Sequence, residues 1–213
     1  MPARSKPNGS TRRRRTQAER REETSGKLLS ATIALLREKG YSRFRIADAA
    51  AKAKVSRGGQ THHFATKNDL VEAAIERLWE REVSHAQVEA AKTEKSAIFR
   101  HAAQHAEDFF YGTLFQVTLN LVISLGASEH LASRVRAIAA KSRAPMEEAW
   151  IEKLVQSGVC HEKAETMMVL LAGVIRGHVV EDHIGGDPGG LEPDIDFAIG
   201  LLNEYLASAA RIS

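Results

Sequence analysis

The residues most able to do chemistry gather in one stretch, Val55 to Phe64, which reads VSRGGQTHHF. It holds a guanidinium, an amide, two hydroxyls and two imidazoles around a pair of glycines. Arginine can pair with a guanine edge and glutamine with an adenine edge, so the stretch suits DNA recognition. Imidazoles also bind metals, but His62 and His63 are neighbours and would point about 100° apart on a helix. The stretch therefore predicts a DNA-reading surface rather than a metal site.

Two other histidine pairs have a spacing that a metal site could use. His101 and His105 are four residues apart and share a helix face, while His178 and His183 have acidic residues between them. With a carboxylate, either pair could hold zinc or iron. This gives the main alternative function, an all-α metal-binding protein or enzyme. The simpler interpretation is polar or pocket-lining histidines, because the sequence contains no tight ligand cluster.

The chain divides sharply by charge. Residues 1–67 carry 17 lysines and arginines against 5 acidic residues, whereas residues 68–213 carry 13 against 22. So basic a segment attracts polyanions, of which nucleic acid is the commonest, and an acidic membrane surface is the alternative. Residues 1–15 hold four consecutive arginines and almost no apolar residues, which predicts a disordered basic arm.

Compartment signals are few. The single cysteine, Cys160, cannot form an intrachain disulfide, which fits a reducing compartment such as the cytoplasm. No apolar run follows the basic N-terminus, so no secretory signal is expected. Residues 109–128 are uncharged and long enough to span a bilayer, but they include polar side chains and glycines. We therefore expect a buried core helix there and no membrane partner.

Helical signals run through the rest of the chain. Thr16 and Glu19 have the spacing of a capping box, and Gly40 ends the helix that starts there. An alanine-rich helix is expected over 45–53 and a long helix over 67–92. No alternating β-branched run is bounded by hairpin turns. The fold class is therefore all-α, with further helices expected over 95–111, 114–126, 129–140, 145–157, 162–184 and 194–211.

The short helix over 45–53 and the stretch after it have the order of a helix-turn-helix motif. Ser56 is a good N-cap for the second helix, and Phe64 would anchor that helix to the core. Gly58 and Gly59 remove side-chain bulk at the end that enters the groove. Arg57, just before them, can reach a guanine edge or a phosphate.

Residues 24–78 resemble the DNA-binding domain of the TetR family of transcriptional regulators. Three stretches carry the resemblance in matching order and spacing: LLSATIALLREKGY, RIADAAAKAKVSRG and HHFATKNDLVEAA. The resemblance implies a DNA-binding regulator and a DNA contact for His63. We expect Arg45 and Lys67 to hold phosphates. The full predicted DNA-binding set is Arg45, Ser56, Arg57, Gly58, Gly59, Gln60, Thr61, His63 and Lys67.

Four positions depart from the family pattern. Lys54 stands where the family commonly has glycine, which costs about 1 kcal/mol if the backbone there is left-handed. Arg45 replaces a hydroxyl residue at the start of the second helix, and it suits a phosphate contact better than a cap. Gln60 and Thr61 replace an aliphatic residue and a tyrosine, so the base preference is expected to depend on them.

By the resemblance, the C-terminal region forms a ligand pocket and a dimer interface. Its aromatic and apolar segment with a few polar groups has the usual character of a small-molecule site. The last two helices are apolar over wide faces, so two copies could pair as a four-helix interface. Such a dimer would suit a palindromic operator in double-stranded DNA. The candidate ligand-binding residues are His105, Phe109, Phe110, Gln116, Asn120 and Trp150.

These observations predict three regions and one function. Residues 1–15 form the basic arm, 16–80 the helix-turn-helix DNA-binding domain, and 81–213 a larger helical domain for ligand binding and dimerisation. The chain is expected to be a homodimeric repressor that an unknown small-molecule effector releases from DNA. No nucleophile elbow, phosphate loop or catalytic carboxylate pair occurs, so we expect neither an enzyme nor a cofactor.

Overall fold

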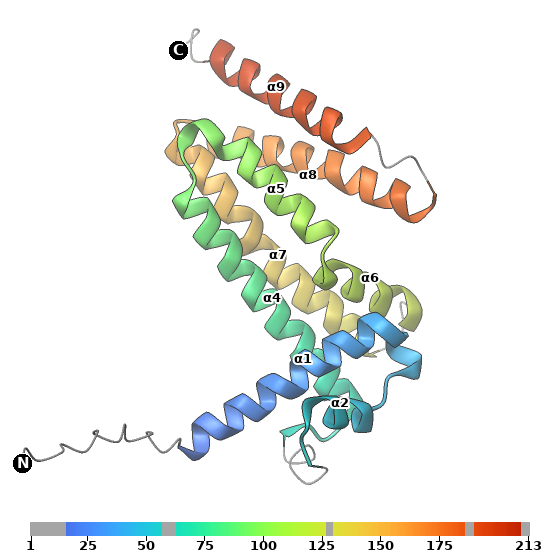
Figure 1. Cartoon of the computed structure of the whole chain (residues 1–213). Coiled ribbons are helices and arrows are strands. Elements are labelled where there is room, and N and C mark those ends of the chain that lie inside the picture. The colour runs from blue at the N-terminus through green and yellow to red at the C-terminus, as the bar shows by residue number, and fades with distance from the viewer. Residues whose placement is uncertain (1–15, 57–62, 127–129, 186–189, 210–213) are drawn as a thin grey trace, which may run out of the picture.

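A computed structural model describes residues 16–56, 63–126, 130–185 and 190–209 of the chain. Within these residues every regular element is a helix (Figure 1), so the predicted all-α class is confirmed. In chain order the elements are α1 (Gln17–Arg43), α2 (Ile46–Ala53), α4 (Lys67–Lys92), the 3₁₀ turn η1 (Lys95–Ala97), α5 (Ile98–Phe110), α6 (Thr113–Leu125), α7 (His130–Gln156), α8 (His161–His183) and α9 (Leu191–Ala209).

The N-terminal unit is made of α1, α2 and the first turns of α4. Its start is the predicted capping box: the Thr16 hydroxyl accepts from the Glu19 N–H at 3.1 Å, and the Glu19 carboxylate accepts from the Thr16 N–H at 2.8 Å. Gly40 has a φ of 70°, so the helical path breaks where the sequence predicts, before one more turn ends at Arg43. Phe44 is 1% exposed and closes the core of this unit.

One helix, α4, joins the N-terminal unit to the larger bundle, and α7 packs along it (Figure 1). It begins with a second capping box, in which Thr66 and Asp69 bond each other's backbone N–H groups at 3.1 and 3.0 Å. The predicted bounds of 67 and 92 are confirmed. The predicted domain boundary at residue 80 falls in the middle of α4, so one rigid element crosses it.

The sequence prediction of two helices over 129–140 and 145–157 was wrong, because α7 runs through both. Pro145 lies inside α7 and is exposed. A proline there removes one backbone hydrogen bond, but the helix survives because both of its halves are held by burial. The buried residues of α7 are Leu131, Ala132 and Val135 before the proline and Met146, Trp150, Ile151 and Leu154 after it.

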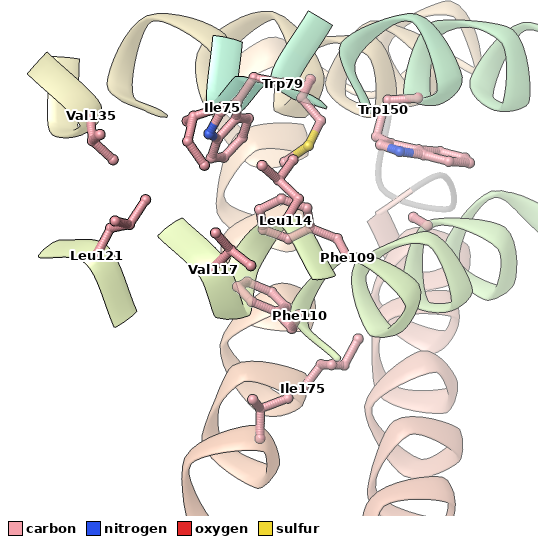
Figure 2. Close-up of a cluster of buried hydrophobic side chains, with 14 of the residues drawn as sticks. Ile75, Trp79, Phe109, Phe110, Leu114, Val117, Leu121, Val135, Trp150 and Ile175 are labelled. Atoms are coloured by element: carbon pink, nitrogen blue, oxygen red, sulfur yellow. The ribbon is translucent and has the colours of Figure 1, made fainter. Parts of the chain in front are cut away.

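The core of the larger bundle is aromatic (Figure 2). The Phe109 ring lies 5.4 Å from the Trp79 ring and 5.1 Å from the Phe110 ring, measured between centroids. Phe115 packs edge-on against Phe110 at 5.0 Å. Tilted and edge-on arrangements at these distances are favourable for aromatic pairs. The first part of the predicted buried segment therefore belongs to the core, whereas Leu119 and Ile123 further along it are exposed at the surface of α6 (Thr113–Leu125).

The uncharged segment bends between α5 and α6. A Cβ atom on Gly112 would lie 2.4 Å from the Asp108 carbonyl oxygen, so only glycine fits the bend. Among the described residues, no single helix has the length and apolar character to cross a membrane. The run Lys95–Phe110 and the helix Thr113–Leu125 meet those criteria only as a pair, with a bend of 47° between them.

Candidate functional site

The helix-turn-helix scaffold is held by small residues. Ala49 and Ala50 of α2 are buried against α1, which lets the two helices approach closely. Arg45 is the N-cap of α2, is exposed, and forms no side-chain capping bond. That position is compatible with the phosphate contact predicted for it.

The turn after α2 has the left-handed backbone for which the family uses glycine. Lys54 has a φ of 57° and is, among the described residues, the one non-glycine residue with a positive φ. The backbone N–H of Val55 donates to the Ala50 carbonyl at 2.9 Å, which fixes the turn. A side chain at such a φ costs about 1–2 kcal/mol, so the turn is strained.

Lys67 occupies an inner position rather than a fully exposed one. Its ammonium donates to the Tyr41 carbonyl at 2.7 Å and lies 3.9 Å from the centroid of the Tyr41 ring. Burial lowers the pKa of Lys67. These contacts fasten the last turn of α1 to the start of α4, and the predicted phosphate contact of Lys67 stays a prediction.

Of the stretch Val55 to Phe64, the structure describes only the two ends. Ser56 is exposed, and His63 is half-buried beside Phe64, with ring centroids 6.3 Å apart. His63 also borders a shallow hollow against the first turns of α1. The predicted contacts of Arg57, Gly58, Gly59, Gln60 and Thr61 lie outside the described residues.

The larger bundle encloses a cavity of about 350 Å³ between α5, α7 and α8. Four predicted ligand residues line it: His105, Phe109, Phe110 and Trp150. The other two do not. Gln116 donates its side-chain amide to the Tyr111 carbonyl at 3.1 Å, and Asn120 is exposed on α6. The structure thus brings together the aromatic residues and His105, but not the two amides. The remaining lining residues are Ala102, Ala106, Arg143, Met146, Glu147, Ile151, Glu165, Met168, Val169, Leu171, Ala172 and Arg176.

Apart from Trp150, sequence reasoning missed the residues of α7 and α8 that line the cavity. Arg143 is exposed and lies 3.4 Å from Glu147, while Arg176 forms no ion pair with any residue that the structure describes. The Arg176 guanidinium carbon is 5.9 Å from the centroid of the Phe110 ring. Because the sequence predicted a break near residue 145, it did not show that Arg143 and Glu147 lie on the same continuous helix as Trp150 and line the cavity with it.

The histidine pairs chosen from sequence spacing do not form metal clusters. His101 is exposed and hydrogen-bonds the Thr93 hydroxyl at 2.9 Å. His178 contacts Asp194 of α9 at 2.9 Å, and His183 bonds the Val179 carbonyl at 2.6 Å. Each of these three histidines therefore has its own local partner, and the alternative metal pairs, 101 with 105 and 178 with 183, do not form ligand groups among the described residues.

A polar contact links the α5–α6 bend to α8. The Tyr111 hydroxyl donates to the Asp182 carboxylate in a short hydrogen bond. Burial, together with this bond and the negative charge of Asp182, raises the pKa of Tyr111 to about 12. The phenol therefore stays protonated and holds the bend in place over the ordinary pH range.

Besides the packing of α1 against α6, two polar contacts link the N-terminal unit to the larger bundle. Arg37 of α1 donates to the Thr113 hydroxyl at the start of α6 at 3.4 Å. Arg134 of α7 forms an ion pair with Glu72 near the start of α4. A displacement of α6 or α7 would therefore reach α1 or α4 directly.

Part of the surface of α8 and α9 is apolar. Exposed fractions are 80% for Ile184 and 69% for Phe197. Gly177 and Gly200 lie on these helices with open space where a Cβ would be. Exposed apolar side chains beside small residues are characteristic of a surface that another helix pair covers. The exposed large apolar residues on these two helices and at the C-cap of α8 are Val169, Leu170, Val180, Ile184, Phe197, Leu201 and Tyr205.

Comparison with known proteins points to the same family as the sequence motifs. Residues 28–74 match the family model described as "Bacterial regulatory proteins, tetR family". The HTH-type transcriptional regulator CymR of Pseudomonas putida is 36% identical over 169 residues, which cover 79% of this chain and 83% of that protein. Among solved structures, a TetR transcription regulator from Haloarcula marismortui superposes with a TM-score of 0.62 at 22% identity, covering 84% of this chain and 96% of that one.

A TetR-family regulator from Mesorhizobium loti superposes with a TM-score of 0.67 at 16% identity, over 85% of this chain and 96% of that one. At such identities the solved structures establish the fold, while the CymR match establishes the family. Membership supports the prediction that the chain is not an enzyme. The chain belongs to the tetR family of bacterial regulatory proteins and is a DNA-binding transcriptional regulator.

Proposed function

We propose that the chain is a homodimeric repressor that leaves its operator when a small molecule enters the cavity between α5, α7 and α8. The cavity carries this proposal. Its volume of about 350 Å³ lies within the range of small-molecule sites, and its aromatic wall with a few polar groups suits a mainly apolar effector. It is also placed beside the helices that connect to the N-terminal unit.

The route from the cavity to DNA would run through α7 and α6. Trp150 lines the cavity on α7, the same helix that holds Glu72 of α4 through Arg134. Phe109 and Phe110 line it on α5, directly before the bend into α6, which contacts Arg37 of α1. An effector that binds one arrangement of these helices more tightly would shift the population toward it. The spacing of two recognition helices in a dimer would change accordingly.

The apolar surface of α8 and α9 supports the dimer. Leu170, Val180 and Ile184 lie near one face of α8, and Phe197, Leu201 and Tyr205 follow every fourth residue of α9. Burying such a surface against a second copy would form a four-helix interface around a twofold axis. Gly177 and Gly200 would let the partner helices approach closely.

The dimer is tested by Phe197→Glu, which places a charge in the proposed interface. The variant should sediment as a monomer at concentrations where the wild type is a dimer. Val88→Glu is the matched control, because Val88 is an exposed apolar residue of α4, away from α8 and α9. A wild-type monomer, or a dimer that survives in Phe197→Glu, would contradict the interface.

The operator is tested by selecting genomic fragments with the purified protein, which should enrich one palindrome. The effector is tested by screening small aromatic and aliphatic molecules for release of that DNA. Ala172→Phe, which fills the cavity from α8, should bind the operator but resist release. If Ala172→Phe responds to an effector as the wild type does, this cavity is not the effector site.

A further inference from the structure

We propose that Glu82, His85 and His105 form a binding site for a divalent transition-metal ion of the zinc class. This inference goes beyond effector-controlled DNA binding and does not depend on it. One ligand atom from each of these residues lies within 4.8 Å of the other two. It is the one group of three or more histidine, cysteine or acidic residues with such an arrangement in the described ranges.

The helices explain why the three side chains meet. Glu82 and His85 are three residues apart on α4, so they project from the same face. A Glu-x-x-His spacing on one helix, completed by a residue from a neighbouring helix, is a known way to build a metal site inside a bundle. Here the neighbouring helix is α5, which supplies His105. The ring centroids of His85 and His105 are 5.6 Å apart.

His105 supplies an independent sign of a missing ligand. Its side chain is 6% exposed, and its Nε2 atom has no hydrogen-bond partner. The Glu82 Oε1 atom lies 3.2 Å from that Nε2, but the two groups are too poorly aligned for a hydrogen bond. A buried polar atom without a partner is costly, by about 1–3 kcal/mol. A metal ion between Nε2 and the carboxylate would satisfy both groups.

The geometry allows the site to close on an ion. Ligand atoms bound to tetrahedral zinc at 2.0–2.1 Å lie roughly 3.4 Å from one another. Glu82 and His105 already meet that spacing, and the His85 ligand atom, within 4.8 Å of both, needs at most a small inward movement. His85 is exposed and borders a shallow hollow on α4, which gives both freedom to rotate and a path for the ion. Two imidazoles and one carboxylate match the preferences of zinc, cobalt and nickel.

The site touches the effector cavity through one residue. His105 lines that cavity, and its ring centroid lies 5.7 Å from the centroid of Trp150. Three protein ligands leave a fourth position of a tetrahedral ion open to water or to another donor. An ion held here would therefore sit at the edge of the cavity, where a bound molecule could complete its coordination.

The test uses the purified full-length chain, without DNA, titrated with Co²⁺ and then with Zn²⁺ against a chromophoric chelator. We expect one Co²⁺ per chain, with visible absorption bands of a four-coordinate ion and quenching of tryptophan fluorescence. Zn²⁺ should displace the Co²⁺. His85→Ala and Glu82→Gln should each lower the affinity at least tenfold, and we expect both variants to fold because His85 is exposed and Glu82 is partly exposed.

His161→Ala is the matched control, because His161 and Glu148 form an exposed histidine–glutamate pair at 3.0 Å. This variant should bind the metal as the wild type does. The site would be ruled out if the wild type takes up no stoichiometric metal, or if His85→Ala or Glu82→Gln binds as tightly as the wild type. Equal loss in His161→Ala would likewise place the ion elsewhere.

Discussion

The N-terminal unit and the larger bundle differ in how completely they are filled. In the N-terminal unit, alanines draw α2 against α1, and Phe44 is almost fully buried. In the larger bundle, aromatic residues of α5 and α7 border a cavity of about 350 Å³, and α8 and α9 leave apolar side chains exposed. The first unit holds most of the residues that match the family model, and we expect it to present the surface that contacts DNA. In the second unit, the cavity and the exposed apolar surface leave the packing incomplete, and these are the places where we propose that an effector and a second copy bind.

The largest expected effect is a difference in stability loss between alanine substitutions of two phenylalanines, one in each region. Phe44→Ala should lower the free energy of unfolding by about 3–5 kcal/mol, because the removed ring leaves a void in a filled core. Phe110→Ala should cost at least about 1 kcal/mol less, since that ring already borders empty space. Urea denaturation of both variants measures the difference. Equal losses would contradict the contrast in packing.

Substitutions of two arginines should distinguish DNA binding from the role of the cavity. Arg57→Ala should weaken operator binding by about 1–3 kcal/mol, because the base contact that we predict for Arg57 would be lost. Arg176→Ala, at the cavity wall, should leave operator affinity unchanged. Fluorescence anisotropy with the selected palindrome gives both affinities. If Arg57→Ala binds as tightly as the wild type, Arg57 does not read a base.

Alkaline pH should weaken the larger bundle through Tyr111. The pKa of Tyr111 in the folded chain, about 12, exceeds the usual value of 10, so its contribution to stability is full below pH 10 and is lost as the pH rises toward 12. Tyr111→Phe should remove this part of the pH dependence and cost about 1 kcal/mol at pH 8. Denaturation curves between pH 8 and 12 measure it. An unchanged alkaline slope in the variant would show that Tyr111 is not the titrating group.

The smallest expected effect is a gain in stability from a substitution in the N-terminal unit. Lys54→Gly removes the strain of a left-handed side chain, about 1–2 kcal/mol, but gives the unfolded chain more freedom. The net gain should be roughly 0.5 kcal/mol by thermal or urea unfolding. Lys52→Gly, in the helical last turn of α2, is the control and should instead be destabilising. A loss of stability in Lys54→Gly would mean that the lysine side chain itself stabilises the turn.

The features that the sequence predicts well are local ones. Thr16 with Glu19, Gly40 and the bounds of α4 all follow from short-range capping and backbone rules, and the structure confirms them. The helix break predicted at Pro145 was wrong because the extensive packing of α7 against α4 outweighs the loss of one backbone hydrogen bond.

For a related reason, only some of the residues that line the cavity could be predicted from the sequence. Phe109 and Phe110 stand out in an uncharged segment, whereas Arg176 and Met168 reach the same space from α8. Likewise, the spacing rule joined His105 to His101 on its own helix, although its closest ligand-type neighbours come from α4. Side chains that meet only through tertiary packing leave no periodic signal in one sequence.

The continuity of α4 has a mechanical consequence. Its 26 residues rise about 1.5 Å each, so the helix is roughly 39 Å long, with one end in the N-terminal unit and the other in the larger bundle. A tilt of about 5° at one end moves the other by roughly 3 Å, about the rise of one base pair along a duplex. We propose that the helix acts as a lever, so that an angular change too small to disturb either core would move the DNA-binding unit out of register with the base pairs.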